Sequence, residues 1–133
     1  MTAVFADTSG LLALINDKDA HHTAAARAFR KLQTRQAPLL TTSAVLVETY
    51  ALLGRRLGVE AVRAFRADFA PLLEVAWVDA ALHEAGLDLL LKQQRRQLSL
   101  VDAISFVVMT QRRIHEAFAF DPHFEQEGFA LLR

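Results

Sequence analysis

The stretch that decides the fold is Ala3-Val4-Phe5-Ala6-Asp7-Thr8-Ser9-Gly10-Leu11-Leu12-Ala13-Leu14-Ile15. Its apolar run Val4-Phe5-Ala6 predicts a short buried strand that ends at Asp7. Thr8 or Ser9 can cap a helix that runs through Ile15 and stops near Asn16-Asp17. A buried strand that passes directly into a helix is typical of proteins in which strands and helices alternate.

This alternation continues to the end of the chain. Further strands are predicted at residues 38–41, 73–78, 117–120 and 129–132. Helices are predicted from Asp19 or Ala20 through Leu32, over 43–57 and 60–69, after the cap Asp79, from Ser99 or Val101 through Met109, and as a turn over 122–126. We therefore predict an α/β fold, a three-layer α/β/α sandwich with a central, mainly parallel sheet. Trp77 is expected to alternate into the core.

Length and composition limit the class of protein. With 133 residues, of which 53% are hydrophobic, the chain is expected to form a single domain over residues 1–133 with a sizeable core. No apolar run approaches the length of a membrane span, and the N-terminus does not resemble a signal peptide, so no membrane partner is expected. The chain has no cysteine, which excludes disulfides and thiol catalysis and fits a cytoplasmic location.

Four carboxylates lie beside apolar runs: Asp7, Glu48, Asp102 and Asp121. Parallel strands place their carboxyl ends at one edge of the sheet, and ligands bind there. Asp7 and Asp121 follow predicted strands, and Glu48 and Asp102 lie early in helices that begin near that edge. Since buried acids are costly unless they are paired or bind a cation, we expect the four to share a metal ion.

Each acid also has a simpler interpretation. Asp7 could cap the first helix, Asp102 could be a first-turn helix acid, and Asp121, before Pro122, could be a turn residue. Glu48 is the hardest to explain as a surface residue, because apolar residues surround it in the sequence.

Basic and other polar residues offer weaker signals. The net charge is zero, and the arginine clusters are either solvated helix faces or phosphate contacts. Arg55 lies two turns after Glu48 and could extend the acidic pocket toward phosphate. Ser105 either lines the pocket or packs between helices. The five histidines show no metal-binding spacing, and we expect them to form no site of their own, although His123 lies close to the last acid.

Four segments, in this order, resemble the motifs of the PIN domain family, the nuclease fold of VapC-type toxins. They are Asp7-Thr8-Ser9, Ser43-Ala44-Val45-Leu46-Val47-Glu48, Leu98-Ser99-Leu100-Val101-Asp102-Ala103-Ile104-Ser105-Phe106 and Phe120-Asp121-Pro122-His123-Phe124. Each segment alone is unspecific, whereas all four at these separations are highly specific. The match runs nearly from end to end.

The resemblance implies RNA cleavage that depends on Mg²⁺ or Mn²⁺, with Asp7, Glu48, Asp102 and Asp121 as the acidic quartet and Ser9 as a hydroxyl near the metal. We assign Asp7 and Asp102 as direct ligands, Asp121 as a direct or water-mediated ligand, and Glu48 as the holder of a bound water or a second ion. One ion or two would fit the pattern. Many relatives carry a second acid where this chain has His123, which puts a fully occupied second metal site in doubt.

The leading hypothesis is therefore a metal-dependent endoribonuclease, the toxin of a VapBC-type toxin–antitoxin pair. Its expected partners are an RNA substrate, a cognate antitoxin and a second copy of the chain in a homodimer. The early helices, residues 9–35 and 43–69, could form the antitoxin groove or the dimer contact. The alternatives are a PIN-domain nuclease of RNA processing, a phosphate-handling protein with an aspartyl nucleophile, and a non-catalytic interaction module on the same fold.

Overall fold

Five parallel strands form the central sheet, in the order β3-β2-β1-β4-β5. The computed structural model describes residues 2–132. The strands are β1 (Val4–Ala6), β2 (Leu39–Thr42), β3 (Leu73–Ala76), β4 (Glu116–Phe118) and β5 (Ala130–Leu131). Because β1 has β2 on one side and β4 on the other, the strand order reverses direction at β1.

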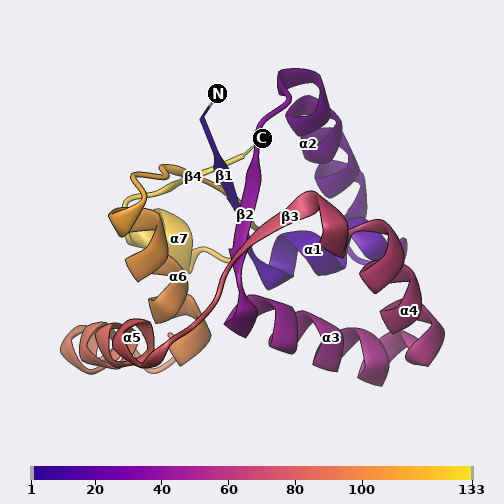
Figure 1. The fold of residues 1–133 in the computed structure, drawn as a ribbon. Coiled ribbons are helices and arrows are strands. Elements are labelled where there is room, and N and C mark those ends of the chain that lie inside the picture. Colours follow the sequence, from indigo (N-terminus) through magenta and orange to yellow (C-terminus); the bar gives the residue numbers. More distant parts are fainter. Residues whose placement is uncertain (1, 133) are drawn as a thin grey trace.

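Helices cover both faces of this sheet (Figure 1). They are α1 (Thr8–Ile15), α2 (His22–Arg35), α3 (Ser43–Leu57), α4 (Val59–Asp68), α5 (Ala80–Gln93), α6 (Leu100–Gln111) and α7 (His123–Gln126), with a short 3₁₀ turn, η1 (Ala70–Leu72), before β3. Figure 1 shows α1 to α4 on one side of the sheet and α5 to α7 on the other. The predicted three-layer α/β/α sandwich is confirmed, and its sheet is parallel at every strand pair.

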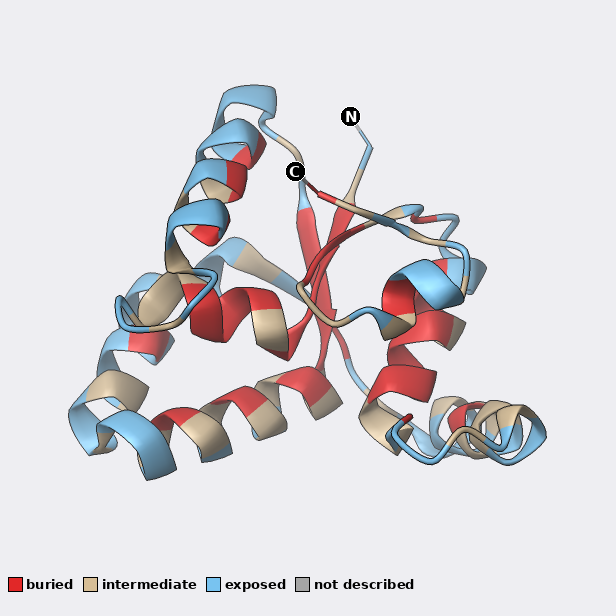
Figure 2. Cartoon of the chain, turned by 180° about the vertical axis from the view of Figure 1, so that it is seen from behind, coloured by how far each residue is buried: buried red, intermediate tan, exposed pale blue. Residues whose placement is uncertain are grey.

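β1 and β2 form the centre of the core, because they lie between the two helical layers. Val4, Phe5 and Ala6 are all fully buried, and all four residues of β2 are buried as well. Figure 2 shows this inner part of the sheet as a continuous buried band. Strands that are covered on both faces read as unbroken apolar runs, which is why the sequence shows no alternation there.

Gly10 sets the distance between α1 and the end of β4. A methyl group at this position would collide with the backbone carbonyl of Phe118. The amide of Asp7 donates to that same carbonyl, at 3.1 Å. The absence of a side chain at Gly10 therefore lets the start of α1 lie directly against β4, next to the end of β1.

The boundaries of several elements differ from the predictions by a few residues. The third predicted strand ends at Ala76 instead of Val78, and the last two strands are shorter than expected. Trp77 is 73% exposed, so the prediction that it points into the core is wrong. The reason is that β3 is an edge strand and ends at Ala76, directly before Trp77. The amide of Val78 then donates to the hydroxyl of Ser43 at 2.9 Å instead of continuing the strand. Within residues 2–132, no helix combines the length and apolarity needed to cross a membrane.

Candidate metal centre

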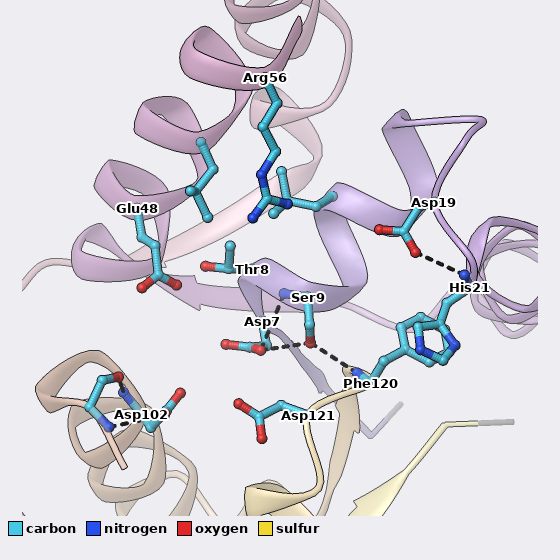
Figure 3. Close-up of a pocket in the computed structure, with 13 residues that line it drawn as sticks. Asp7, Thr8, Ser9, Asp19, His21, Glu48, Arg56, Asp102, Phe120 and Asp121 are labelled. Carbon is cyan, nitrogen blue, oxygen red and sulfur yellow. Dashed lines mark hydrogen bonds between the residues drawn. The ribbon is translucent and has the colours of Figure 1, made fainter. Parts of the chain in front are cut away.

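A pocket of about 340 Å³ lies at the carboxyl ends of β1 and β4, where the strand order reverses. This is the position at which open parallel sheets bind ligands. All four predicted acids line the pocket: Asp7, Glu48, Asp102 and Asp121. Figure 3 shows their carboxylates directed toward a common space from β1, α3, α6 and the segment after β4.

Asp7 occupies the first turn after β1 and is 3% exposed. Its Oδ2 atom accepts hydrogen bonds from the Ser9 amide at 3.3 Å and from the Ser9 hydroxyl at 2.8 Å, so Asp7 itself caps α1. The predicted caps, Thr8 and Ser9, lie inside the helix instead. Capping and site formation are therefore compatible roles for this carboxylate, because the bonds from Ser9 reach one oxygen and leave the other for a ligand.

Asp102 is 8% exposed and lies in the first turn of α6. It forms a reciprocal capping box with Ser99: the Asp102 amide donates to the Ser99 hydroxyl at 3.1 Å, and the Ser99 amide donates to Asp102 Oδ2 at 3.2 Å. This pair fixes the rotamer of Asp102. The simpler interpretation of Asp102 as a helix-terminal acid is thus correct, and the helix start that it stabilises also delivers the carboxylate to the pocket.

Asp121 follows β4, and its Oδ1 atom accepts the amide of His123 at 2.9 Å in a local turn. Asp102, Asp121 and His123 each offer one ligand atom, and these three atoms all lie within 4.8 Å of one another. The Nδ1 atom of His123 is buried, and no residue of the described chain forms a hydrogen bond with it. His123, which the sequence places close to the last acid, therefore lies beside two of the four acids.

Glu48 lies in the second turn of α3 and is partly buried, on the opposite side of the pocket from Asp121 in Figure 3. The arginine that lines the pocket is Arg56 and not the predicted Arg55. The two are adjacent on α3, so they point about 100° apart around the helix. The phase of α3 against the sheet selects Arg56, which lies eight positions after Glu48, just over two helical turns.

Burial dominates the electrostatics of the site, and repulsion between the acids adds to it. Burial raises the pKa of Asp7 from its ordinary 3.8 to about 7, and the nearby charge of Asp102 adds to this rise, while the bonds from Ser9 oppose it. Burial also raises the pKa of Asp102, with a further contribution from the charge of Asp121, against the bonds from Ser99. Acids that hinder one another's ionisation in this way form a strong candidate site for a cation.

The donor set fits a hard divalent cation. Carboxylate oxygens are the ligands that Mg²⁺ and Mn²⁺ prefer, and Mg²⁺ retains several waters, so that a few protein ligands suffice. The imidazole of His123, whose buried Nδ1 atom lacks a hydrogen-bond partner in the described chain, adds a ring nitrogen beside two of the acids. An ion at this position would offset the burial and the repulsion that together raise the pKa values of Asp7 and Asp102.

Ser9 and Ser105 have structural contacts that the sequence left open. The Ser9 hydroxyl donates to Asp7 and accepts the amide of Phe120 at 2.9 Å, so it ties the end of β1 to the segment after β4. The hydroxyl of Ser105 is fully buried and donates to the Val101 carbonyl at 2.9 Å, within α6. Of the two roles that the sequence left open, the structure therefore supports packing and not lining of the pocket.

Sequence reasoning did not place several other residues that line the pocket, among them Asp19, His21, Ser99 and Phe120. The sequence indicates Ser99 only as a helix cap and Phe120 only as a strand residue. His21 and Asp19 precede α2, and nothing in their local pattern distinguishes them from an ordinary helix start.

Comparison with known proteins places this geometry in a family. The model of the PIN domain matches residues 4–129. The 23S rRNA-specific endonuclease VapC20 of Mycobacterium tuberculosis, from strains CDC 1551 / Oshkosh and ATCC 25618 / H37Rv, is 37% identical over 131 residues, which are 98% of this chain and 98% of the relative.

Solved structures give the same result. The crystal structure of M. tuberculosis VapC20, named there a Sarcin-Ricin loop cleaving toxin, superposes with a TM-score of 0.84 at 38% identity, over 96% of this chain and 97% of that one. FitAcB from Neisseria gonorrhoeae shares the fold, with a TM-score of 0.67 at 11% identity over 98% of this chain and 96% of the other. The chain therefore belongs to the PIN domain family, and within that family it is similar to the VapC-type toxins.

Proposed function

We propose that this protein is an endoribonuclease that uses a bound Mg²⁺ or Mn²⁺ to hydrolyse phosphodiester bonds of RNA, and that it is the toxin of a toxin–antitoxin pair. The observation that carries the proposal is the convergence of Asp7, Asp102 and Asp121, from three separate elements, in one pocket where the pKa values of two of them are raised. A fold that buries like charges together destabilises itself unless a cation joins them.

Asp102 and Asp121 would hold the cation together with Asp7, and His123 supplies a nitrogen beside them. A divalent ion bound there would supply charge neutralisation of the phosphate and would lower the pKa of a water molecule toward neutrality. Ser9 and Ser99 orient Asp7 and Asp102 through the hydrogen bonds described above, which keeps the ligands fixed before substrate arrives.

Two other residues would act on the reactants. Glu48 faces the pocket from α3, where its carboxylate can accept a hydrogen bond from the attacking water and orient it toward phosphorus. Arg56 lines the same pocket further along α3, where its guanidinium can bind a phosphate oxygen of the RNA backbone. Both assignments use residues of one helix, so its orientation against the sheet aligns water and backbone together.

The substrate that we propose is a loop of 23S ribosomal RNA. The relative that shares 37% of its residues is named for that RNA, and the matching crystal structure is named for cleavage of its Sarcin-Ricin loop. Loops present splayed bases and an accessible backbone, whereas a regular RNA helix hides its deep groove from side chains. Because ribosomes are cytoplasmic, we propose that the protein acts in the cytoplasm.

A cognate antitoxin and a second copy of the chain are the protein partners that we propose. Support comes from large apolar side chains exposed on α3 and at the start of α4: Val47 (70% exposed), Leu57 and Val59. These lie within the region 43–69 that the sequence suggested for a partner. Exposed apolar residues that are grouped on two consecutive helices, here α3 and α4, favour a contact with another protein.

The test is cleavage of 23S rRNA and of an isolated Sarcin-Ricin loop RNA by protein purified without its antitoxin, in Mg²⁺, Mn²⁺ or EDTA. Asp102→Asn should abolish cleavage while the protein stays folded. Asp79→Asn is the matched control, because Asp79 also caps a helix by accepting a backbone amide but lies on the surface, away from the pocket. Cleavage that persists in EDTA or in Asp102→Asn would refute the proposal, as would folded wild-type protein that neither binds Mn²⁺ nor cleaves either RNA.

A further inference from the structure

Two aromatic rings are stacked at the rim of the metal pocket. The imidazole of His21 lies against the phenyl ring of Phe120, with ring centroids 4.6 Å apart and planes 8° from parallel. Both residues line the same pocket as the four acids, and Figure 3 shows the stacked pair beside Asp121 and Ser9. His21 is exposed and Phe120 is half-buried, so the phenyl ring backs a histidine that faces solvent.

The stack is fixed relative to the acids through the backbone. The amide of His21 donates to Asp19 Oδ1 at 2.8 Å, which sets the turn before α2. The amide of Phe120 donates to the hydroxyl of Ser9, which in turn donates to Asp7. Phe120 also directly precedes Asp121 in the chain. Hydrogen bonds and chain connectivity therefore link the stacked pair to the proposed metal ligands.

The neighbouring histidine, His22, has a structural role that differs from that of His21. A ring nitrogen of His22 lies 2.9 Å from the carbonyl of Ala13, so this side chain joins α2 to α1. His21 is instead directed to the pocket and packs flat on a second ring. A flat, exposed aromatic face beside a phosphate-binding site is the arrangement on which proteins stack an unpaired nucleobase.

We propose that His21, backed by Phe120, is the stacking platform for the base of an unpaired nucleotide next to the scissile phosphate. This inference rests on the proposed nuclease function and narrows its substrate class to RNA in which a base at the cut is splayed out of any helix. Arg56 lines the same pocket from α3, and its guanidinium could bind the backbone of the same strand. The base contact and the backbone contact would then both hold the strand in the pocket with the acids.

The probe for the test is hexaadenylate RNA, with a ribose–phosphate oligomer of equal length that lacks bases as the control ligand. Both are titrated in Mg²⁺ into the full-length protein while the ring proton signals of its histidines are followed by NMR. Stacking of adenine on His21 shifts its ring protons upfield through the ring current of the base. The base-free oligomer should leave these signals in place.

Variants separate stacking from other contacts. His21→Ala should weaken hexaadenylate binding about fivefold or more, in keeping with stacking energies measured by alanine substitution. His21→Phe keeps a flat ring and should bind within about twofold of wild type, whereas a hydrogen bond or charge from imidazole would be lost in it. His83→Ala removes another exposed histidine, on α5 and outside the pocket, and should have no effect. Because His21 is exposed, the variants should fold normally.

The inference is overturned if hexaadenylate moves the His21 signals no more than the base-free oligomer does, or if His21→Phe loses as much affinity as His21→Ala. It is also overturned if only a partner protein, and not RNA, shifts those signals, since the platform would then be a protein contact. Failure of the proposed function is recognised separately, by the absence of cation-dependent cleavage of ribosomal RNA in the same preparation.

Discussion

Replacement of Asp7 by asparagine should stabilise the metal-free protein at pH 8. The folded carboxyl group holds its proton up to a pKa of about 7, because it is buried and lies near Asp102, whereas the unfolded one releases it near 3.8. Between these values the folded state binds more protons, so the stability of the metal-free wild type falls as the pH rises through this window and levels off above it. The amide side chain of the variant would carry no charge at any pH.

The size of the effect follows from the pKa shift. A shift of roughly three units corresponds to about 4 kcal/mol at 1.36 kcal/mol per unit. We expect Asp7→Asn to gain about 2–4 kcal/mol at pH 8, or roughly 10 °C in Tm, and only about 1 kcal/mol at pH 4.5, where the carboxyl group is mostly protonated in the folded state. The hydrogen bonds from Ser9 can still reach the amide oxygen, so the cap of α1 survives.

The assay is urea unfolding in EDTA at the two pH values, with wild type and Asp7→Asn measured side by side. Asp79→Asn makes the same chemical change at an exposed helix cap and should alter stability by less than about 0.5 kcal/mol. Added Mn²⁺ should narrow the difference: wild type gains about 2.7 kcal/mol at a concentration of 100 times its Kd, and Asp7→Asn gains less. If the gain from Asp7→Asn is equal at pH 4.5 and pH 8, or is absent at pH 8, the argument from buried charge is wrong.

Three other substitutions test separate parts of the structure. Arg56→Ala should weaken RNA binding and reduce by about one the slope of log affinity against log salt, as measured by filter binding at several salt concentrations. Arg55→Ala, its neighbour outside the pocket, should leave both the affinity and this slope nearly unchanged in the same assay. Gly10→Ala should lower the free energy of unfolding by about 2–4 kcal/mol in thermal or urea unfolding, because its methyl group meets a backbone carbonyl. The control Gly54→Ala places its methyl group 3.5 Å from the side chain of Val62 and should be neutral or raise the free energy of unfolding by up to about 1 kcal/mol. Equal effects of the two substitutions would contradict the packing argument. His123→Asp turns a mixed nitrogen and oxygen donor set into oxygen alone, so the ratio of Co²⁺ to Mg²⁺ affinity should fall about tenfold or more in calorimetry, and an unchanged ratio would show that the imidazole does not bind the ion.

Much of the fold follows from local sequence. The order of strands and helices is predicted correctly, because apolar runs, helix caps and turn residues act over a few neighbouring positions. The convergence of Asp7 and Asp121 is also predictable, since parallel strands bring their carboxyl ends to one edge. The simpler roles of Asp7, Asp102 and Asp121 as caps and turn residues are part of the same geometry.

Other features depend on contacts between distant segments. The sequence places an arginine on the pocket side of α3, but the choice of Arg56 over Arg55 depends on how the helix is rotated against the sheet. Trp77 is exposed because β3 lies at an edge of the sheet and ends before this residue. The local sequence pattern does not indicate the position of a strand within the sheet.

The sequence by itself determined the succession of elements, the family and the four acids, because each of these is written in short segments. Only the tertiary structure brought His21 onto Phe120, residues 99 positions apart, and placed His123 beside Asp102. It also decided that the pKa of Asp7 lies near neutrality, since desolvation depends on everything packed around the carboxyl group and not on its neighbours in the chain.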